Sequence, residues 1–488
     1  MKRSSGVLLP VSSLPSPYGI GSFGLEARRW VDFLADAGQS FWQILPLSPT
    51  DESGSPYQSV SAFAGAEYYI DLEALCEEGL LDRIECVGVT WGRSERYVDY
   101  ETLSMLREPL LRKAYSRFGE TVALDRFISQ NHWADDYCLY MSVKAAQGGR
   151  SWIEWEEPFR ARQHEALCEI RRSRADDYRF HAFIQYQFNR QWSALRAYAN
   201  DRGVRIIGDI PIYVALDSAD VWSNPSLFQL GSDDLPIEIA GYPPDALSDY
   251  GQLWGNPLYN WTAMAGTGYR WWIERLQNSF GLYDVIRIDH FRGLESYYAI
   301  PYGGIPAQGQ WRQGPGNSFI DAVKNAMPDV SFIAEDLGAP SAEVDRLLEY
   351  SGFPGMKVLQ FAFDPLGDRE NRPYKYISNT VVYPGTHDND TVKGWAGNTQ
   401  DIYVDHAMEY IGINNREDLP RGMIRAAMQS AADLAIIQMQ DWLELGSEAR
   451  INTPSTTGGN NWRWRLNGEE LTTEMAAEMA RMTATYDR

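Results

Sequence analysis

Residues 285–293 read VIRIDHFRG, and this stretch connects the expected fold with the expected site. Val285, Ile286 and Ile288 make a short apolar run, which is typical of a buried β-strand. The run ends in Asp289 and His290, so two polar side chains follow the strand directly. In parallel α/β folds, functional groups gather at the carboxyl ends of the strands. This stretch therefore predicts a strand that delivers an acid to a site.

The same pattern recurs along the chain. Eight short runs of β-forming residues are expected at 6–11, 41–47, 204–210, 285–288, 331–334, 357–361, 380–383 and 450–452. Helical spacing is expected between several of them, at 25–37, 271–280, 319–327, 342–350 and 423–443, with Gly38 as the stop of the first helix. Eight alternating strands and helices predict the α/β class and a (β/α)8 TIM barrel. A doubly wound open sheet with a helical cap is the alternative.

The length of 488 residues predicts one large domain with insertions. A plain barrel needs about 250 residues, so the remainder must lie between strands at the C-terminal face. We expect a single catalytic domain over 1–488. Within it, residues 72–180 are expected to form a mostly helical insertion, with helices at 101–118 and 164–178. Residues 215–261, rich in Pro, Gly, Asp and Tyr, are expected to form a loop-rich insertion.

Composition excludes several classes of protein. The net charge of −22 argues against nucleic acid as a partner. No apolar run reaches about 18 residues, so no membrane association is expected, and the N-terminal stretch does not resemble a signal peptide. The four cysteines lack metal-binding spacing, which favours free thiols, no metal and a cytoplasmic location. No phosphate-binding glycine motif occurs, so no cofactor is expected.

Four expected strand ends carry acids: Asp209, Asp289, Glu335 and Asp388. An Asp and a Glu on neighbouring strands can lie about 5–5.5 Å apart, as retaining glycosidases require. Arg287, two residues before Asp289, would keep that carboxylate ionised, and burial near other acids would raise the pKa of Glu335. The aromatic content of 13% also suits stacking on sugar rings. Taken singly, each acid could equally be a helix cap and the Arg a structural ion-pair partner.

Three motifs resemble a known family. The stretches RIDHFRG (287–293), AEDLG (334–338) and GTHDND (385–390) are similar to the catalytic regions of the α-amylase superfamily, and specifically to 4-α-glucanotransferases of the amylomaltase type. SPYQ (55–58), SAFAG (61–65), GQLWGNPLY (251–259) and RINTP (450–454) strengthen the resemblance. It runs essentially from residue 5 to residue 465.

The resemblance implies roles for individual residues. Asp289 would be the nucleophile, Glu335 the general acid/base and Asp388 the stabiliser of the transition state. The implied substrate-binding residues, with acceptor stacking assigned to Trp254, are Tyr57, Asp209, Arg287, His387, Trp254, Ser55, Asp245 and Asp364. Asn460 or Asn461 are weaker candidates.

The implied activity is retaining transfer of α-1,4-glucan segments between maltooligosaccharides, or to glucose, through a covalent glycosyl-aspartate. Two alternatives stay open: an α-amylase-like hydrolase and a non-catalytic carbohydrate-binding protein. The chain departs from the family pattern at Ala66, at Ser455 and at Ala246-Leu247, where a Tyr-Phe pair is common. Acceptor length, cyclic glucan formation and pathway are therefore left open.

Overall fold

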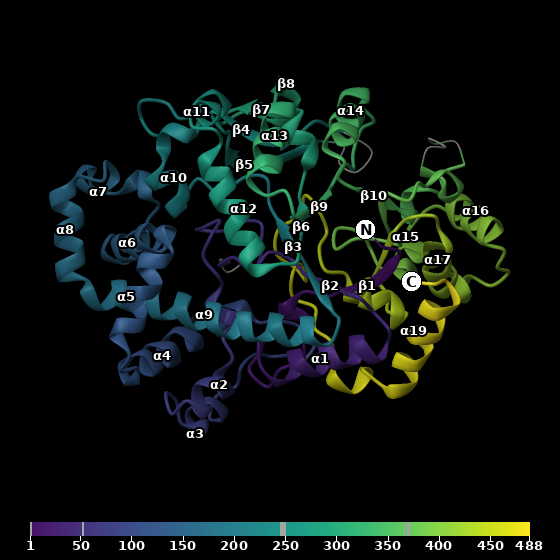
Figure 1. Cartoon of the computed structure of the whole chain (residues 1–488), viewed down its shortest axis with the longest axis horizontal. Helices are drawn as coiled ribbons and strands as arrows, with labels where there is room; N and C mark the ends of the chain where they lie inside the picture. Colours follow the sequence, from purple (N-terminus) through teal and green to yellow (C-terminus); the bar gives the residue numbers. More distant parts are fainter. Residues whose placement is uncertain (1, 51–52, 245–249, 366, 368–370) are drawn as a thin grey trace.

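The computed structural model describes residues 2–50, 53–244, 250–365, 367 and 371–488. Within these residues, eight parallel strands follow one another in chain order around a barrel at the middle of the molecule (Figure 1). The last strand returns to the first, since Ser4 to Leu8 pair with Leu434 to Gln438. The predicted (β/α)8 barrel is confirmed. The strands are β1 (Ser4–Leu8), β2 (Phe41–Gln43), β3 (Arg205–Ile210), β6 (Val285–Ile288), β9 (Ser331–Ala334), β10 (Gly355–Val358), β11 (Thr380–Tyr383) and β12 (Leu434–Gln438).

The strand residues divide between two apolar layers because successive side chains point to opposite faces. One set fills the inside of the barrel and is fully or almost fully buried. It includes Leu8, Phe41, Ile207, Val285, Ile333, Met356, Val381 and Leu434. The alternate set, exemplified by Val7, Trp42, Ile206 and Ile286, belongs to the larger core between the strands and the outer helices. The barrel is thus a packed core with an open mouth.

The helices that cover the barrel begin with α1, which spans Leu25–Asp36 and buries Trp30, Phe33 and Leu34 as its spacing predicts. Gly38 follows with φ of 67°, a left-handed backbone that favours glycine, so the predicted stop is confirmed. The other covering helices are α12 (Arg270–Leu282), α13 (Asn317–Ala326), α14 (Ala342–Ser351), α15 (Val392–Asn398), α16 (Asp401–Ile411), α17 (Leu419–Gln429), α18 (Met439–Trp442) and α19 (Thr473–Thr485).

The eighth strand was wrongly predicted. The structure has it at Leu434–Gln438, inside the stretch expected to be helix 423–443, and residues 450–452 are not a strand. Helix α17 ends at Gln429, and the five buried residues of β12 then insert between β11 and β1. A short apolar run flanked by helical residues has the same hydrophobic pattern whether it forms a helix or a strand. Pairing with two strands that are distant in the sequence makes this run a β-strand.

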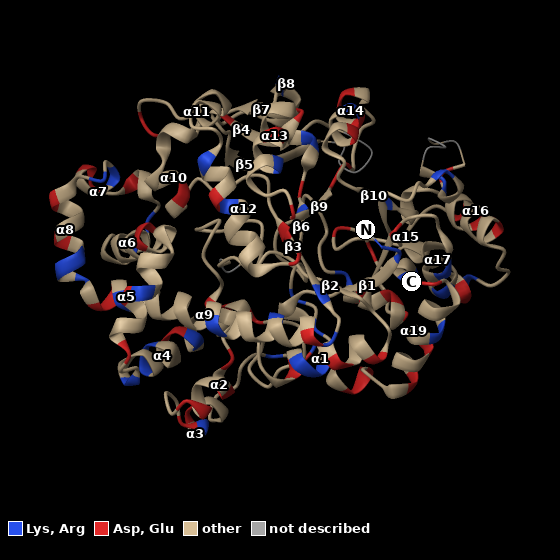
Figure 2. Ribbon diagram, viewed as in Figure 1, with Lys and Arg blue, Asp and Glu red and all other residues tan. Residues whose placement is uncertain are grey.

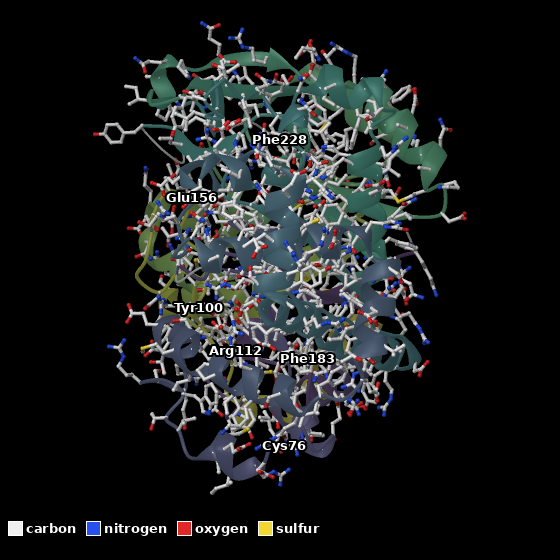
Figure 3. All side chains as sticks on the ribbon, turned by 90° about the vertical axis from the view of Figure 1, so that its left-hand side faces the viewer. Cys76, Tyr100, Arg112, Glu156, Phe183 and Phe228 are labelled. Carbon is white, nitrogen blue, oxygen red and sulfur yellow. The ribbon has the colours of Figure 1, made fainter. Side chains whose placement is uncertain are left out.

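The insertion between β2 and β3 is helical and forms the left-hand side of Figure 1. Figure 3 looks onto this side and labels Cys76, Tyr100, Arg112 and Phe183 from it. The insertion ends in a 27-residue helix, α9, which leads directly into β3. Its helices are α2 (Leu72–Glu77), α3 (Arg83–Val87), α4 (Tyr100–Arg117), α5 (Thr121–Gln130), α6 (His132–Ala146), α7 (Glu157–Arg160), α8 (His164–Ser173) and α9 (Ala175–Asp201).

Residues 215–261 contain more regular structure than the expected loops. Besides the short helices α10 (Ala219–Ser223) and α11 (Trp261–Gly266), they supply two strands to a second, antiparallel sheet. Its order is β5 (Gln252–Pro257), β4 (Glu238–Tyr242), β7 (Ser296–Pro301) and β8 (Gln310–Gln313). The Gly, Asn and Pro residues of β5 are typical of loops, and pairing with β4 overrides that local preference.

The outer surface carries charges of both signs. Figure 2 shows acidic residues spread over the outer helices with basic ones among them. Among the described residues, no helix is both long enough and apolar enough to cross a bilayer.

Candidate active site

A pocket of about 870 Å³ opens at the carboxyl ends of the barrel strands. Carboxylates, aromatic rings and amides line it together. Most of the site residues predicted from the sequence are among its lining: Ser55, Tyr57, Trp254, Arg287, Asp289, Glu335, His387 and Asp388. Loops that are far apart in the chain thus converge on one cavity.

The floor of the pocket is an ion pair between neighbouring strands. Asp209 on β3 and Arg287 on β6 are register partners in the parallel ladder. Nη1 of Arg287 lies 2.7 and 2.6 Å from the two carboxylate oxygens of Asp209 and 2.9 Å from Oδ1 of Asp289. Arg287 and Asp289 are two residues apart on one strand, so both side chains project to the same face. One guanidinium therefore holds two acids.

Asp289 and Glu335 stand side by side. Ile288 on β6 pairs with Ala334 on β9, and each acid is the next residue along its strand. Neighbouring strands are about 4.7–4.9 Å apart, a spacing close to the roughly 5–5.5 Å between carboxyl groups that a retaining pair needs. The backbone continues the contact, since the N–H of Glu335 donates to the carbonyl of Ile288 at 3.0 Å. Adjacent strands thus bring the two acids together as the sequence predicted.

The carboxyl group of Glu335 sits in a closed environment. Its Oε2 accepts from the N–H of His290 at 2.7 Å and its Oε1 from the N–H of Leu337 at 3.0 Å. Burial nevertheless raises the pKa of Glu335 to about 7, with Asp336 adding to the rise, because the apolar surroundings penalise the charged form more than Arg287 and these N–H groups favour it. The group is protonated over a large part of the neutral range.

Arg287 is one of several groups that affect the charge of Asp289. Arg287 contacts it and favours its charge, but burial, together with Asp209, Glu335 and Asp388, outweighs this and raises the pKa of Asp289 above its usual value. The expectation that Arg287 keeps Asp289 ionised stays a prediction, because its contact favours the charge while burial and the neighbouring acids oppose it. The charge of Glu335 is one of those that disfavour the charge of Asp289.

Tyr57 and His387 form a stacked pair over the floor. Their rings lie 5.5 Å apart and 15° from parallel. The hydroxyl of Tyr57 donates to Oδ2 of Asp209 at 2.7 Å, so its oxygen is left to accept from Nε2 of His387 at 2.9 Å. Burial lowers the pKa of His387, which keeps the ring neutral with its proton on Nε2. The pair fixes the orientation of both groups toward the cavity.

Asp388 is the most open of the acids, with 42% of its side chain exposed. The loop of the RINTP motif fixes it, since Nδ2 of Asn452 donates to Oδ1 of Asp388 at 2.7 Å and Arg450 donates to its carbonyl at 2.8 Å. Sequence reasoning quoted this motif without giving Asn452 a role. No signal in the sequence assigns this role to Asn452, because the nearest preceding strand, β12, ends at Gln438.

Two predicted substrate-binding residues are not part of the pocket lining, and a third falls on residues that the structure does not describe. Asp209 is beneath the lining rather than on it, because Arg287 and Tyr57 cover its fully buried side chain. Asp364, which follows β10 and a helical turn, is outside the lining of the pocket. Asp245 lies outside the described residues. Of the weaker candidates, Asn461 lines the pocket, whereas Asn460 is exposed and does not.

Several lining residues were not predicted as site residues, among them Tyr213, Tyr242, His290 and Trp462. His290 has φ of 50°, a left-handed backbone that turns the chain after β6, and its ring lies edge-on to Trp254 at 4.9 Å. Burial lowers the pKa of His290 to about 4, so it is neutral. Aromatic residues in a chain with 13% aromatics gave no signal that could separate lining from core.

Groups able to hold a metal are not found: no cluster of three or more His, Cys, Asp or Glu with suitable geometry occurs in the described ranges. The pocket presents carboxylates, histidine rings and aromatic rings. A parallel barrel whose mouth pairs two coupled acids beside stacked aromatic rings defines a carbohydrate-active enzyme.

Comparisons with known proteins specify the family. A family model described as 4-alpha-glucanotransferase matches residues 9–472. The chain is 46% identical to a 4-alpha-glucanotransferase of Streptococcus pneumoniae, over 100% of this chain and 98% of the relative, and 42% identical to one of Thermus thermophilus, over 100% and 99%. It superposes with a TM-score of 0.97 on the amylomaltase from Streptococcus agalactiae solved with acarbose, at 39% identity and full coverage of both chains. The chain belongs to the 4-alpha-glucanotransferase family.

Membership confirms the resemblance drawn from the motifs and the enzymatic activity that it implied. The activity of the family is the transfer of α-1,4-glucan segments, so the substrates are α-glucans and maltooligosaccharides. A second amylomaltase structure, from Corynebacterium glutamicum, has 20% identity and a TM-score of 0.80, and it supports the fold alone.

Proposed function

We propose that Asp289 is the nucleophile and Glu335 the general acid/base of a retaining transfer. The observation that carries this assignment is their adjacency at the ends of paired strands β6 and β9, both lining one pocket. Glu335 protonates the leaving glycosidic oxygen while the Asp289 carboxylate attacks the anomeric carbon and forms a glycosyl-aspartate. Glu335, now ionised, accepts the proton of the 4-hydroxyl of an acceptor sugar, which attacks the same carbon and releases Asp289.

The assignment of roles within the pair follows from their contacts. Burial raises the pKa of both carboxyl groups, and the charge of Glu335 adds to the rise at Asp289, so the proposed mechanism needs a contact that favours the anion at Asp289. Arg287 contacts Asp289 directly at 2.9 Å, whereas backbone N–H groups alone contact Glu335. A full positive charge at hydrogen-bond distance favours the anion more than an N–H dipole does. The charge therefore resides on Asp289 and the proton on Glu335.

The remaining residues bind the sugar at the cleaved bond. Tyr57 offers its ring, and Asp388, His387 and Arg287 offer polar groups to the same space. Asp388 is suited to stabilise positive charge on the oxocarbenium-like transition state, because its exposed carboxylate faces the pocket. Asp209 is a positioning residue, which orients Arg287 and Tyr57 from below. Ser55 lines the pocket beside Tyr57.

Transfer rather than hydrolysis requires a bound acceptor. Trp254, which lines the pocket from β5, offers an aromatic face on which an acceptor sugar can stack. A stacked acceptor displaces water and presents its hydroxyl at the intermediate, which replaces a bimolecular step by a positioned one. The donor is an α-1,4-glucan or a maltooligosaccharide, and the acceptor is glucose or another maltooligosaccharide.

A cytoplasmic location completes the proposal. All four cysteines are free thiols, and the sulfurs of Cys76 and Cys86 lie 3.9 Å apart without a bond. Two thiols this close persist unpaired in a reducing compartment. The net charge of −22 argues against nucleic acid as a partner.

Incubation of the pure protein with maltotriose tests the function. Transfer produces glucose and a ladder of longer oligosaccharides, whereas an α-amylase-like hydrolase shortens the sugar without lengthening it. Asp289→Asn is the matched control, since it keeps the shape of the carboxyl group but not its nucleophilicity. Full activity in this variant would overturn the assignment of the nucleophile, and no product from the wild type would favour a non-catalytic binding protein.

A further inference from the structure

We propose that Trp311 on β8, with the polar groove further along that strand, binds the outer part of a long α-1,4-glucan whose other end occupies the catalytic pocket. This inference rests on the proposed function, because it concerns the same substrate. It adds a second binding site outside the pocket, on the antiparallel sheet.

Trp311 is a fixed and partly open aromatic ring. The guanidinium of Arg292 lies 4.3 Å from the centroid of the Trp311 ring. The rings of Tyr298 and Tyr242 pack edge-on against it, with centroid distances of 5.2 and 5.8 Å. Despite these three contacts, 39% of Trp311 is exposed. A ring that is already held in place loses little conformational freedom on binding, and its open part is suited to the apolar face of a sugar.

The ring is continuous with the catalytic pocket. Tyr242 lines the pocket and touches both Trp311 and His290, whose centroid is 5.9 Å away. His290 in turn lies 4.9 Å from Trp254. Each of these steps is comparable to the length of one glucosyl unit. A glucan chain that stacks on Trp254 therefore has a short, aromatic-lined route to Trp311.

A polar groove of about 610 Å³ lies further along β8. Gln313, two residues further along β8 and so on the same face, lines the groove and donates to the carbonyl of Glu295 at 2.7 Å. The rest of its lining comes from the start of α13 and from α14, which lie near β8 at the top of Figure 1. The groove carries Glu295, Gln313, Asn317, Glu343, Arg346 and Tyr350.

The polar groups of this groove favour a neutral ligand that carries hydroxyl groups. Carboxylate, amide and phenol groups exchange hydrogen bonds with neutral hydroxyls, and the three glutamates, Glu295, Glu343 and Glu349, disfavour an anionic ligand. Pairing of β8 with a strand of a second copy is the competing use, because β8 is an edge of its sheet. The charged Arg312 on β8, which pairs with Glu238 of β4 at 2.8 Å over the intervening β7, disfavours such pairing.

Binding to long and short glucans tests the proposal. In the Asp289→Asn background, soluble amylose and maltotriose are titrated against the parent, Trp311→Ala, Gln313→Ala and the control Tyr374→Ala, which removes an aromatic ring that is 67% exposed elsewhere. We expect Trp311→Ala to weaken amylose binding about tenfold. Gln313→Ala is expected to weaken it less, and maltotriose binding and the control should be unchanged.

In the otherwise wild-type enzyme, Trp311→Ala should raise KM for amylose by the same factor and leave kcat and maltotriose turnover unaltered. Amylose binding equal to that of the parent overturns the proposal. So does an equal loss for maltotriose accompanied by a lower Tm, which would mark Trp311 as structural, or a change of oligomeric state in Trp311→Ala. Activity retained by Asp289→Asn would instead refute the proposed mechanism and leave the binding result standing.

Discussion

The guanidinium of Arg287 lies 2.6 Å from the carboxylate of Asp209, and the two side chains are 3% and 0% exposed. They are direct partners in the ladder of β3 and β6, so the backbone itself sets their separation. The same nitrogen of Arg287 reaches Asp289. One arginine therefore links the buried acid of the neighbouring strand to an acid that lines the pocket.

The first prediction concerns the stability that this pair provides. Arg287→Met leaves Asp209 buried without its counter-charge and should lower the free energy of unfolding by about 3–5 kcal/mol. The double variant Arg287→Met/Asp209→Asn removes the charge as well and should recover part of the loss. Urea unfolding of the three proteins measures both values. A single variant as stable as the wild type, or a double variant less stable than the single one, would contradict the prediction.

The second prediction concerns the pH dependence of catalysis. Since the pKa of Glu335 is raised to about 7, the protonated acid is lost as the pH rises through that value, and kcat/KM should fall on the alkaline side. Glu335→Gln should abolish this limb and slow maltotriose turnover roughly 10²–10⁴-fold. With α-maltosyl fluoride, whose leaving group needs no proton, glycosylation of the variant should be far less impaired. Equal impairment with both donors would argue against the acid role.

The third prediction concerns stability against pH. The folded-state pKa of Glu335 is above its unfolded value, so the unfolded chain loses this proton first and the wild type loses stability as the pH rises from about 4.5 to about 7. Glutamine has no proton to lose. Glu335→Gln should therefore match the wild type at pH 4 and have the higher Tm at pH 8. A constant difference in Tm over this range would show that titration is not its cause.

The fourth prediction concerns the positioning of Asp388. Asn452 donates to its Oδ1, and loss of a hydrogen bond to a charged group costs about 1.5–3 kcal/mol. If this cost is incurred in the transition state, Asn452→Ala should lower kcat about 10–100-fold with a small change in KM. Asn379→Ala, which alters an exposed Asn far along the chain, is the matched control. A rise in KM with kcat unchanged would assign Asn452 to substrate binding instead.

The repeating pattern of strand and helix predicted the barrel because local periodicity and barrel geometry agree at most positions. It failed at Leu434–Gln438, where an apolar run follows a helix without a strong break and only pairing with β1 and β11 reveals the strand. It failed again at β4 and β5, whose Gly, Asn and Pro residues are typical of loops. In both places, long-range hydrogen bonding overrides local preference.

The candidate site also has features that the sequence predicts and features that only the fold reveals. The motifs around Asp289, Glu335 and Asp388 specify which chemical groups stand at the strand ends, since those groups immediately follow the strands that carry them. Whether such a group faces the cavity cannot be read from spacing, as Asp209 shows, because Arg287 and Tyr57 close over it.

The sequence by itself therefore determined the family, the barrel and which acids we propose as the reacting groups. The tertiary structure decided what each acid can do. Burial raises the pKa of Glu335 and couples Asp289 to it, and a loop 64 residues beyond Asp388 supplies the amide that holds that carboxylate. These effects depend on solvent exclusion and on distances between groups remote in the chain, and such quantities exist only once the chain has folded.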